Sequence, residues 1–266
     1  MTIAIVLLCV LNLALLVAAL VMLRRMRRRI ARIRDAQRRE RRHPLWPQLE
    51  SLIGLYRLLD GKAVLPNLRR QSVSPDFLLH VVRYIQEHAP KRIVECGSGS
   101  STIAMAQALR AFGIEGHVYA IENYEPSAAA VRDQLRRHDL ERFVTLVFAP
   151  LVQKRYDGVG RAIGWYDFEA GAIPDDIDLL LVDGPIAVVH TDARYPAGPE
   201  LLPKLSRTAH IFVDDANRRG ERDMVERWRR LYPNLAVREL PAEKGCLELF
   251  FLDKSQSPAK SISAPA

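Results

Sequence analysis

The apolar positions of this chain follow different patterns along its length, and the first is an unbroken run. From Ile3 to Leu23 there are 21 residues, of which Asn12 is the only clearly polar one. A helix of that length rises about 31 Å, which matches the hydrocarbon core of a bilayer. We therefore expect residues 1–23 to form a transmembrane anchor.

A cleaved signal peptide is the alternative interpretation of this run. Such a peptide begins with basic residues, has a shorter apolar stretch and ends at a small-residue cleavage site. Here no Lys or Arg precedes the run, and eleven arginines follow it between residues 24 and 42. Because basic flanks stay on the cytoplasmic side, we predict a single-pass anchor in the inner or plasma membrane, with the N-terminus outside and the remaining chain in the cytoplasm.

The segment after the anchor changes to a helical period. Residues 24–43 keep an apolar stripe among the arginines, which predicts a basic juxtamembrane helix near anionic headgroups. A charge cluster that only sets the topology of the anchor is the alternative to specific lipid recognition. Prolines within residues 44–47 end this segment. An amphipathic helical lead-in is expected over residues 44–90, and its last helix should run from Pro75 to His88 with Ser74 as N-cap.

Beyond residue 90, short apolar runs alternate with helical stretches, as in a parallel sheet covered on both faces. We predict an α/β, Rossmann-like fold over residues 91–253: a seven-stranded, mostly parallel sheet with helices on both faces, ending in an antiparallel hairpin. The tail, residues 254–266, is expected to be disordered. The expected strands are Arg92–Glu95, His117–Glu122, Val144–Phe148, Leu179–Asp183, Ala209–Asp214, Ala236–Leu240 and Cys246–Leu252, and the helices between them are Ser101–Phe112, Pro126–Arg137, Pro199–Lys204 and Gly220–Leu231.

The distribution of charge and the positions of the cysteines exclude some classes of partner and site. The net charge is +8, but residues 24–42 alone carry +9, so the remainder is nearly neutral. That distribution lacks a general nucleic-acid footprint, and no nucleic-acid partner is expected. The three cysteines have neither disulfide nor metal spacing.

The loop after the first expected strand carries the strongest chemical signal. Glu95 ends that strand, and Gly97 and Gly99 let the chain pass close to a ligand at the carboxyl end of a parallel sheet. Glu122 ends the next strand, where an acid can accept both hydroxyls of a ribose. A dinucleotide is the competing ligand, but its fingerprint requires a third glycine where Thr102 stands.

This loop resembles the E/D-x-G-x-G-x-S/T motif of class I S-adenosylmethionine-dependent methyltransferases. Over roughly residues 72–252 the chain is similar to a bacterial subgroup of methyltransferase-like proteins, related in layout to the catechol O-methyltransferase type; the further matching stretches are Ser74–Leu79, Trp165–Asp167, Leu180–Pro185, Arg194–Pro196 and Val213–Ala216. The resemblance implies S-adenosylmethionine as cofactor, with Glu95 near its methionine amino group and Glu122 on its ribose. The implied cofactor contacts are Glu95, Gly97, Gly99, Ser101, Glu122, Asn123, Pro150 and Asp183.

Three carboxylates end two neighbouring expected strands. Asp183 follows one, and Asp214 with Asp215 follows the other, so they should converge over the sulfonium end of the cofactor. Three hard oxygen donors suit Mg²⁺, and the catechol-type enzymes hold such an ion with an Asp and an Asp-Asn pair to activate an acceptor hydroxyl. Here Asp215 replaces that Asn. The alternative is that Asp214 or Asp215 caps the next helix.

The remaining catalytic candidates lie in the loop after Asp183. His190 is a candidate general base and Arg194 a candidate clamp for an anionic acceptor. Trp165, Tyr166 and Asp167 are expected to form a lid or an acceptor wall, while packing on the sheet explains Trp165 equally well. The leading hypothesis is a membrane-anchored cytoplasmic methyltransferase acting on a small-molecule or membrane-associated acceptor, by O-methylation with a divalent metal in one version. The alternatives are a non-catalytic methyltransferase-like binding module at the membrane and an NAD(P)-dependent oxidoreductase.

Overall fold

The computed structural model describes residues 20–27, 29–30, 45–59, 65–69, 72–157, 159–186 and 191–252. The chain divides into two units, Met1–Trp46 and Pro47–Ala266. In the first unit, residues 20–27 and 29–30 are helical. The rest of the expected anchor and of the basic helix, and the tail, lie outside the described residues. Within the described ranges, no helix is both long enough and apolar enough to cross a bilayer.

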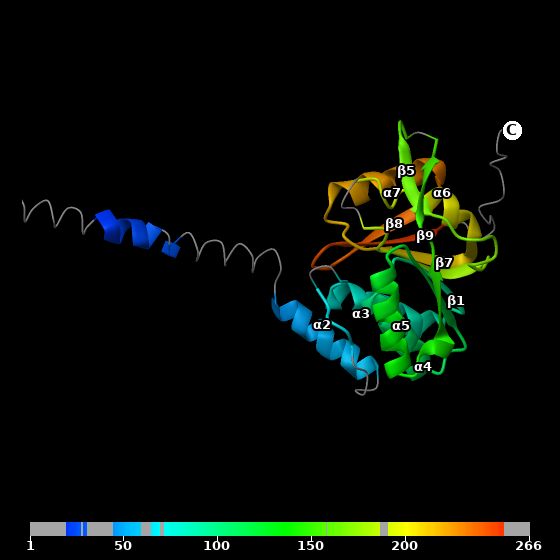
Figure 1. Ribbon diagram of the computed structural model, residues 1–266, viewed down its shortest axis with the longest axis horizontal. Coiled ribbons are helices and arrows are strands. Elements are labelled where there is room, and N and C mark those ends of the chain that lie inside the picture. The colour runs from blue at the N-terminus through cyan, green and yellow to red at the C-terminus, as the bar shows by residue number, and fades with distance from the viewer. Residues whose placement is uncertain are drawn as a thin grey trace, which may run out of the picture. The chain divides into compact units, whose positions relative to one another are not determined.

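A seven-stranded sheet forms the centre of the second unit (Figure 1). The strands in spatial order are β3 (Val144–Phe148), β2 (His117–Glu122), β1 (Arg92–Cys96), β6 (Ile177–Val182), β7 (Leu205–Val213), β9 (Cys246–Phe251) and β8 (Leu235–Leu240). The first five strands in this order are parallel, and β9 is antiparallel to both of its neighbours. This confirms the predicted Rossmann-like α/β sheet with its terminal hairpin.

Helices cover both faces of the sheet because successive strand residues point to opposite sides. Ile93 of β1 packs into one apolar core, with α2, α3, α4 and α5, whereas Val94 packs into the other, with α6 and α7. The two groups of helices lie on opposite sides of the strands in Figure 1. The helices are α2 (Leu45–Leu58), α3 (Pro75–His88), α4 (Ser100–Ala111), α5 (Glu125–Arg137), α6 (Ala197–Leu201) and α7 (Arg219–Leu231), with 3-10 turns at Glu141–Phe143 and Leu202–Lys204.

Asp76, in the first turn of α3, ties the helical lead-in to the C-terminal hairpin. Its Oδ2 accepts hydrogen bonds from the side-chain amide of Gln48 in α2 and from the backbone N–H of Glu243, at 2.7 Å for the latter. Its Oδ1 accepts the N–H of Phe77 at 2.9 Å. Ser74 occupies the N-cap position as expected, but its hydroxyl makes no capping bond. The first turn of α3 therefore relies on Asp76 instead.

A second, two-stranded sheet was not expected from the sequence. β4 (Leu151–Arg155) pairs antiparallel with β5 (Ala162–Tyr166). The signal that could have revealed this ribbon is the dipeptide Asp157-Gly158 between two five-residue strands, because Asp-Gly favours hairpin turns. The ribbon places Trp165 and Tyr166 in the second apolar core, where both side chains are buried.

Candidate cofactor and active site

A cleft of about 540 Å³ opens at the carboxyl ends of β1, β2 and β6. The strand order changes direction between β1 and β6, which is where open α/β sheets bind ligands. The volume falls within the roughly 300–1,000 Å³ typical of small-molecule sites. The predicted site residues in its lining are Glu95, Gly97, Gly99, Ser101, Glu122, Asn123 and Asp183, joined by Ser98 and Tyr166.

The Glu95 carboxylate is held by the first turn of α4. Its side chain is buried, and it accepts hydrogen bonds from the hydroxyls of Ser101 and Thr102, the latter at 2.6 Å. Thr102 Oγ1 in turn accepts the N–H of Gly99 at 2.9 Å. Thr102, where a dinucleotide fingerprint would have glycine, therefore links the acid to the glycine loop. Burial raises the pKa of Glu95 to about 8, although the two hydroxyls act to lower it.

Glu122 is fully occupied as a hydrogen-bond acceptor. One oxygen accepts the backbone N–H groups of Asn123 and Tyr124, both at 2.8 Å. The other accepts the N–H of Ser98 at 3.1 Å and its hydroxyl at 2.9 Å. Since a carboxylate offers about four lone-pair sites, a ribose hydroxyl bound there would displace the Ser98 hydroxyl. The β1 and β2 loops are thus joined through this acid.

The two glycines of the loop have different roles. Gly97 has a φ of +91°, a left-handed conformation that favours glycine, and its N–H donates to Ile121 at 2.9 Å. Gly99 has an extended backbone, and a Cβ added to it would meet no atom within 4 Å. The space beside Gly99 therefore belongs to the cleft, and a side chain there would enter the volume that a ligand needs.

Asp183, Asp214 and Asp215 converge at the ends of β6 and β7, and each offers an oxygen within 4.8 Å of the other two. Neither Asp214 nor Asp215 caps α7, because its N-cap is Arg218 and no side chain bonds there. Burial raises the pKa values of Asp183 and Asp214. The predicted juxtaposition is therefore present, and the helix-cap alternative is not.

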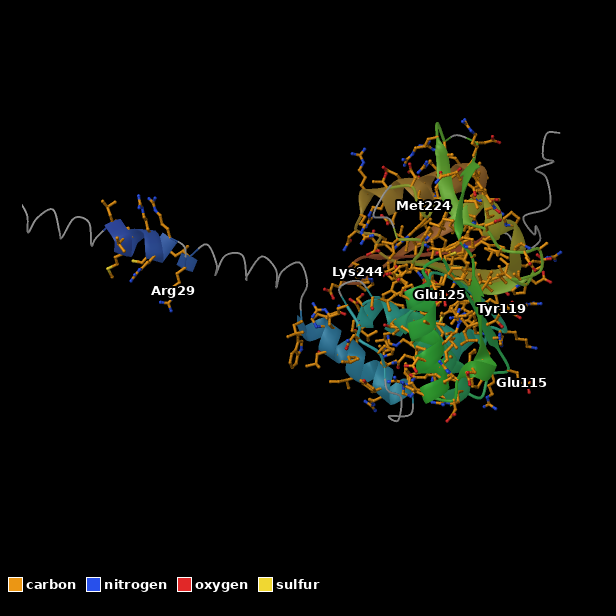
Figure 2. All side chains as sticks on the ribbon, viewed as in Figure 1. Arg29, Glu115, Tyr119, Glu125, Met224 and Lys244 are labelled. Atoms are coloured by element: carbon orange, nitrogen blue, oxygen red, sulfur yellow. The ribbon has the colours of Figure 1, made fainter. Side chains whose placement is uncertain are left out.

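A cation of the chain itself already stands among these carboxylates. The buried Arg194 donates from Nη2 to Asp183 at 3.1 Å and to Asp215 at 3.0 Å, and from Nη1 to the Asp214 carbonyl at 3.2 Å. Lys244, labelled in Figure 2, lies 3.6 Å from Asp214 in the loop between β8 and β9. A divalent ion needs several oxygens at about 2.0–2.6 Å. Here the carboxylates of Asp183 and Asp215 already bond a guanidinium, and the Asp214 carboxylate faces an ammonium group. The trio as arranged does not fit a divalent ion.

Three other residues that the sequence assigned to the site differ in where they lie. Pro150 is exposed and absent from the described cleft lining; its carbonyl accepts the N–H of Asp167 at 2.8 Å. His190 lies outside the described residues. Tyr166, which the sequence placed in a lid or an acceptor wall, has a buried side chain that lines the cleft. Its hydroxyl has no hydrogen-bond partner among the described residues.

Comparisons with known proteins relate this chain to methyltransferases. Residues 94–216 match a family model described as a methyltransferase domain. The fold is similar to that of the S-adenosylhomocysteine-bound methyltransferase PaMTH1 of Podospora anserina, with a TM-score of 0.51 at 16% identity over 76% of this chain and 88% of that one. A Geobacter sulfurreducens methyltransferase matches with a TM-score of 0.48 at 17% identity, over 78% of this chain and 90% of that one. No curated protein shows a detectable match.

The strand order and the cleft at the switch point define an α/β protein with a small-molecule site at the carboxyl edge of its sheet. The match over residues 94–216 identifies that part of the chain as a methyltransferase domain.

Proposed function

We propose that the protein transfers the methyl group of S-adenosylmethionine to an oxygen of a small-molecule or membrane-associated acceptor. The acceptor oxygen attacks the sulfonium methyl carbon, the carbon–sulfur bond breaks, and S-adenosylhomocysteine leaves. The hydroxyl proton passes to a base of the protein. For such an in-line displacement the enzyme mainly aligns the reacting atoms, about 3 Å apart.

The observation that carries the cofactor assignment is the open space at Gly99 between two buried carboxylates. Glu95 and Glu122 end adjacent parallel strands, and both line the same cleft. In the proposed complex Glu122 accepts from the ribose, Glu95 faces the methionine amino group, and the backbone at Gly99 passes beneath the cofactor. Ser101 acts through Glu95, to which it donates.

Asp183 is the proposed proton acceptor. It lines the cleft beside Pro185 and Ile186, and its carboxylate is oriented by the hydrogen bond from Arg194. Burial raises its pKa above that of an ordinary aspartate, and a general base works best when its pKa lies near the operating pH. The exposed side chain of Ile186 offers an apolar wall for the acceptor at that end. His190 stays a candidate base.

The tether is proposed from the sequence. The apolar run Ile3–Leu23 and the arginines after it support a single-pass anchor with the catalytic unit on the cytoplasmic side. A tethered enzyme meets acceptors that are themselves at the membrane. Alkaline carbonate extraction tests this: the full chain should stay with the membrane, and a chain without residues 1–23 should be released. Release of the full chain would contradict the tether.

Titration calorimetry with S-adenosylhomocysteine on the full chain tests the cofactor site. Gly99→Val should reduce affinity by more than about tenfold, or 1.4 kcal/mol, because the new side chain enters the cleft without meeting protein atoms. Gly160→Val is the matched control, since Gly160 is exposed and its added Cβ also meets nothing within 4 Å. Binding of NAD(P) in place of S-adenosylhomocysteine would refute the assignment.

Transfer itself is tested with S-adenosylmethionine carrying a labelled methyl group and a total membrane-lipid and metabolite extract as acceptor. Label should move to an extract component, and Asp183→Asn should abolish this transfer while S-adenosylhomocysteine still binds. Cofactor binding without transfer to any component would favour the non-catalytic binding module.

A further inference from the structure

The side chain of Arg194 is buried, and the loop that carries it is held by contacts with α7. The backbone carbonyl of the next residue, Tyr195, accepts a hydrogen bond from Trp228 at 2.8 Å. The Arg227 guanidinium lies over the Tyr195 ring, 4.5 Å from its centroid. α7 therefore clamps the loop immediately beside Arg194, whose side chain is only 5% exposed.

From this position Arg194 bonds two carboxylates of the acidic trio and the backbone of its third member. Its Nη2 is shared between Asp183 and Asp215, at 3.1 and 3.0 Å, and its Nη1 donates to the Asp214 backbone carbonyl at 3.2 Å. A metal ion held by the three carboxylates would lie within a few ångströms of this positive charge. In a buried site, where water screens little, such like-charge contact is strongly unfavourable.

Two further cations of the chain offset the negative charge of the trio. Arg218 pairs with Asp215 at 2.9 Å, and Lys244 lies 3.6 Å from Asp214 and 3.8 Å from Asp215. Asp214 and Asp215 are buried and absent from the described cleft lining, so of the trio only Asp183 faces the cleft. A hydrated ion arriving through the cleft would meet one carboxylate of the trio, which is already bonded to Arg194.

We propose that Arg194 permanently takes the place that a divalent metal ion would occupy among these carboxylates, so that the chain works without a metal. Arg194 is a positioning residue: it holds Asp183 toward the cleft and neutralises the charge behind it. The part of this inference that concerns catalysis rests on the proposed function, whereas the charge replacement concerns the apoprotein alone.

Manganese binding to the full chain in detergent tests the replacement, with the metal alone as probe. The electron paramagnetic resonance signal of free Mn²⁺ should be undiminished by wild-type protein at ion concentrations below about 1 mM. Arg194→Met removes the cation but keeps an apolar stem, and it should bind one equivalent of Mn²⁺. Arg222→Met is the matched control, because that arginine lies on α7 and pairs with Glu239 outside the trio, and this variant should bind none.

A thermal measurement covers the case in which Arg194→Met folds poorly. Added Mn²⁺ should raise its unfolding temperature, because ligands that bind only the native state stabilise it, and should leave that of the wild type unchanged. Stoichiometric Mn²⁺ binding by the wild type would overturn the proposal, as would a folded Arg194→Met that binds none. Neither readout involves S-adenosylmethionine, so failure of the proposed function would appear separately, as absent cofactor binding.

Discussion

Gly184, after β6, lies directly against Gly97, after β1. A Cβ on Gly184 would come 2.7 Å from the Gly97 backbone nitrogen, 2.8 Å from its Cα and 2.5 Å from the Tyr166 hydroxyl. The two loops on either side of the switch point are thus in backbone contact. This approach closes the floor of the cleft, which both glycines line.

Gly184→Ala should destabilise the fold and distort the cleft together. The added methyl meets backbone atoms that cannot rotate away, so we expect a loss of about 1–3 kcal/mol in the free energy of unfolding, measured by urea denaturation. Gly160→Ala, whose methyl meets nothing, should change stability by less than about 0.5 kcal/mol. Equal stability of the two variants would show that the backbones of Gly184 and Gly97 leave room for a methyl group.

Glu95 should make stability depend on pH. Burial raises its folded pKa from 4.5 to about 8, so between these values the native state holds a proton that the unfolded chain releases. The contribution of this group is complete below pH 4.5 and is lost as pH rises toward 8, at up to about 1.4 kcal/mol per pH unit. The difference in unfolding free energy between wild type and Glu95→Gln, measured from pH 5 to pH 8, should show this decline; a constant difference would contradict it.

Ser98→Ala separates the two functions of the Glu122 carboxylate. The Ser98 hydroxyl occupies an acceptor position that a ribose hydroxyl needs, so its removal should leave S-adenosylhomocysteine affinity unchanged or higher. Glu122→Ala should lower that affinity about 100-fold, because two hydrogen bonds to a charged group are worth roughly 3 kcal/mol together. Calorimetry on both variants, with circular dichroism as the folding control, decides this. A large loss in Ser98→Ala would instead place that hydroxyl on the ligand.

Tyr166→Phe tests a hydroxyl that lines the cleft without a partner. A buried hydroxyl with no hydrogen bond costs about 1–3 kcal/mol, so the apoprotein should be as stable as wild type or more stable. If the ligand supplies the missing partner, the same variant should bind S-adenosylhomocysteine about tenfold more weakly. Trp165→Phe, which changes a neighbouring buried ring that is absent from the described lining, is the control for general damage to the ribbon. Unchanged affinity in Tyr166→Phe would mean that the hydroxyl faces no ligand group.

Much of the fold could be predicted because each strand and helix follows from its local pattern. α3 has the predicted bounds, and the sheet strands and other long helices begin and end within a few residues of those expected. The β4–β5 ribbon was missed because the residues of its strands show no clear apolar alternation. β4 has no buried residue that would mark one of its faces. The Ser74 cap was predicted from residue type alone, and the structure uses Asp76, whose other partners are 28 and 167 residues away.

The sheet, the glycine loop and the acids at the strand ends could be predicted from local patterns, because all of these depend on spacing along a short stretch of chain. The cation that faces Asp183, Asp214 and Asp215 is set by the three-dimensional packing. Any Arg or Lys among the chain's 39 had the right charge, and a buried ion pair depends on which side chains the folded chain brings within about 3 Å of the carboxylates. Clamping of its loop by α7 places Arg194 there.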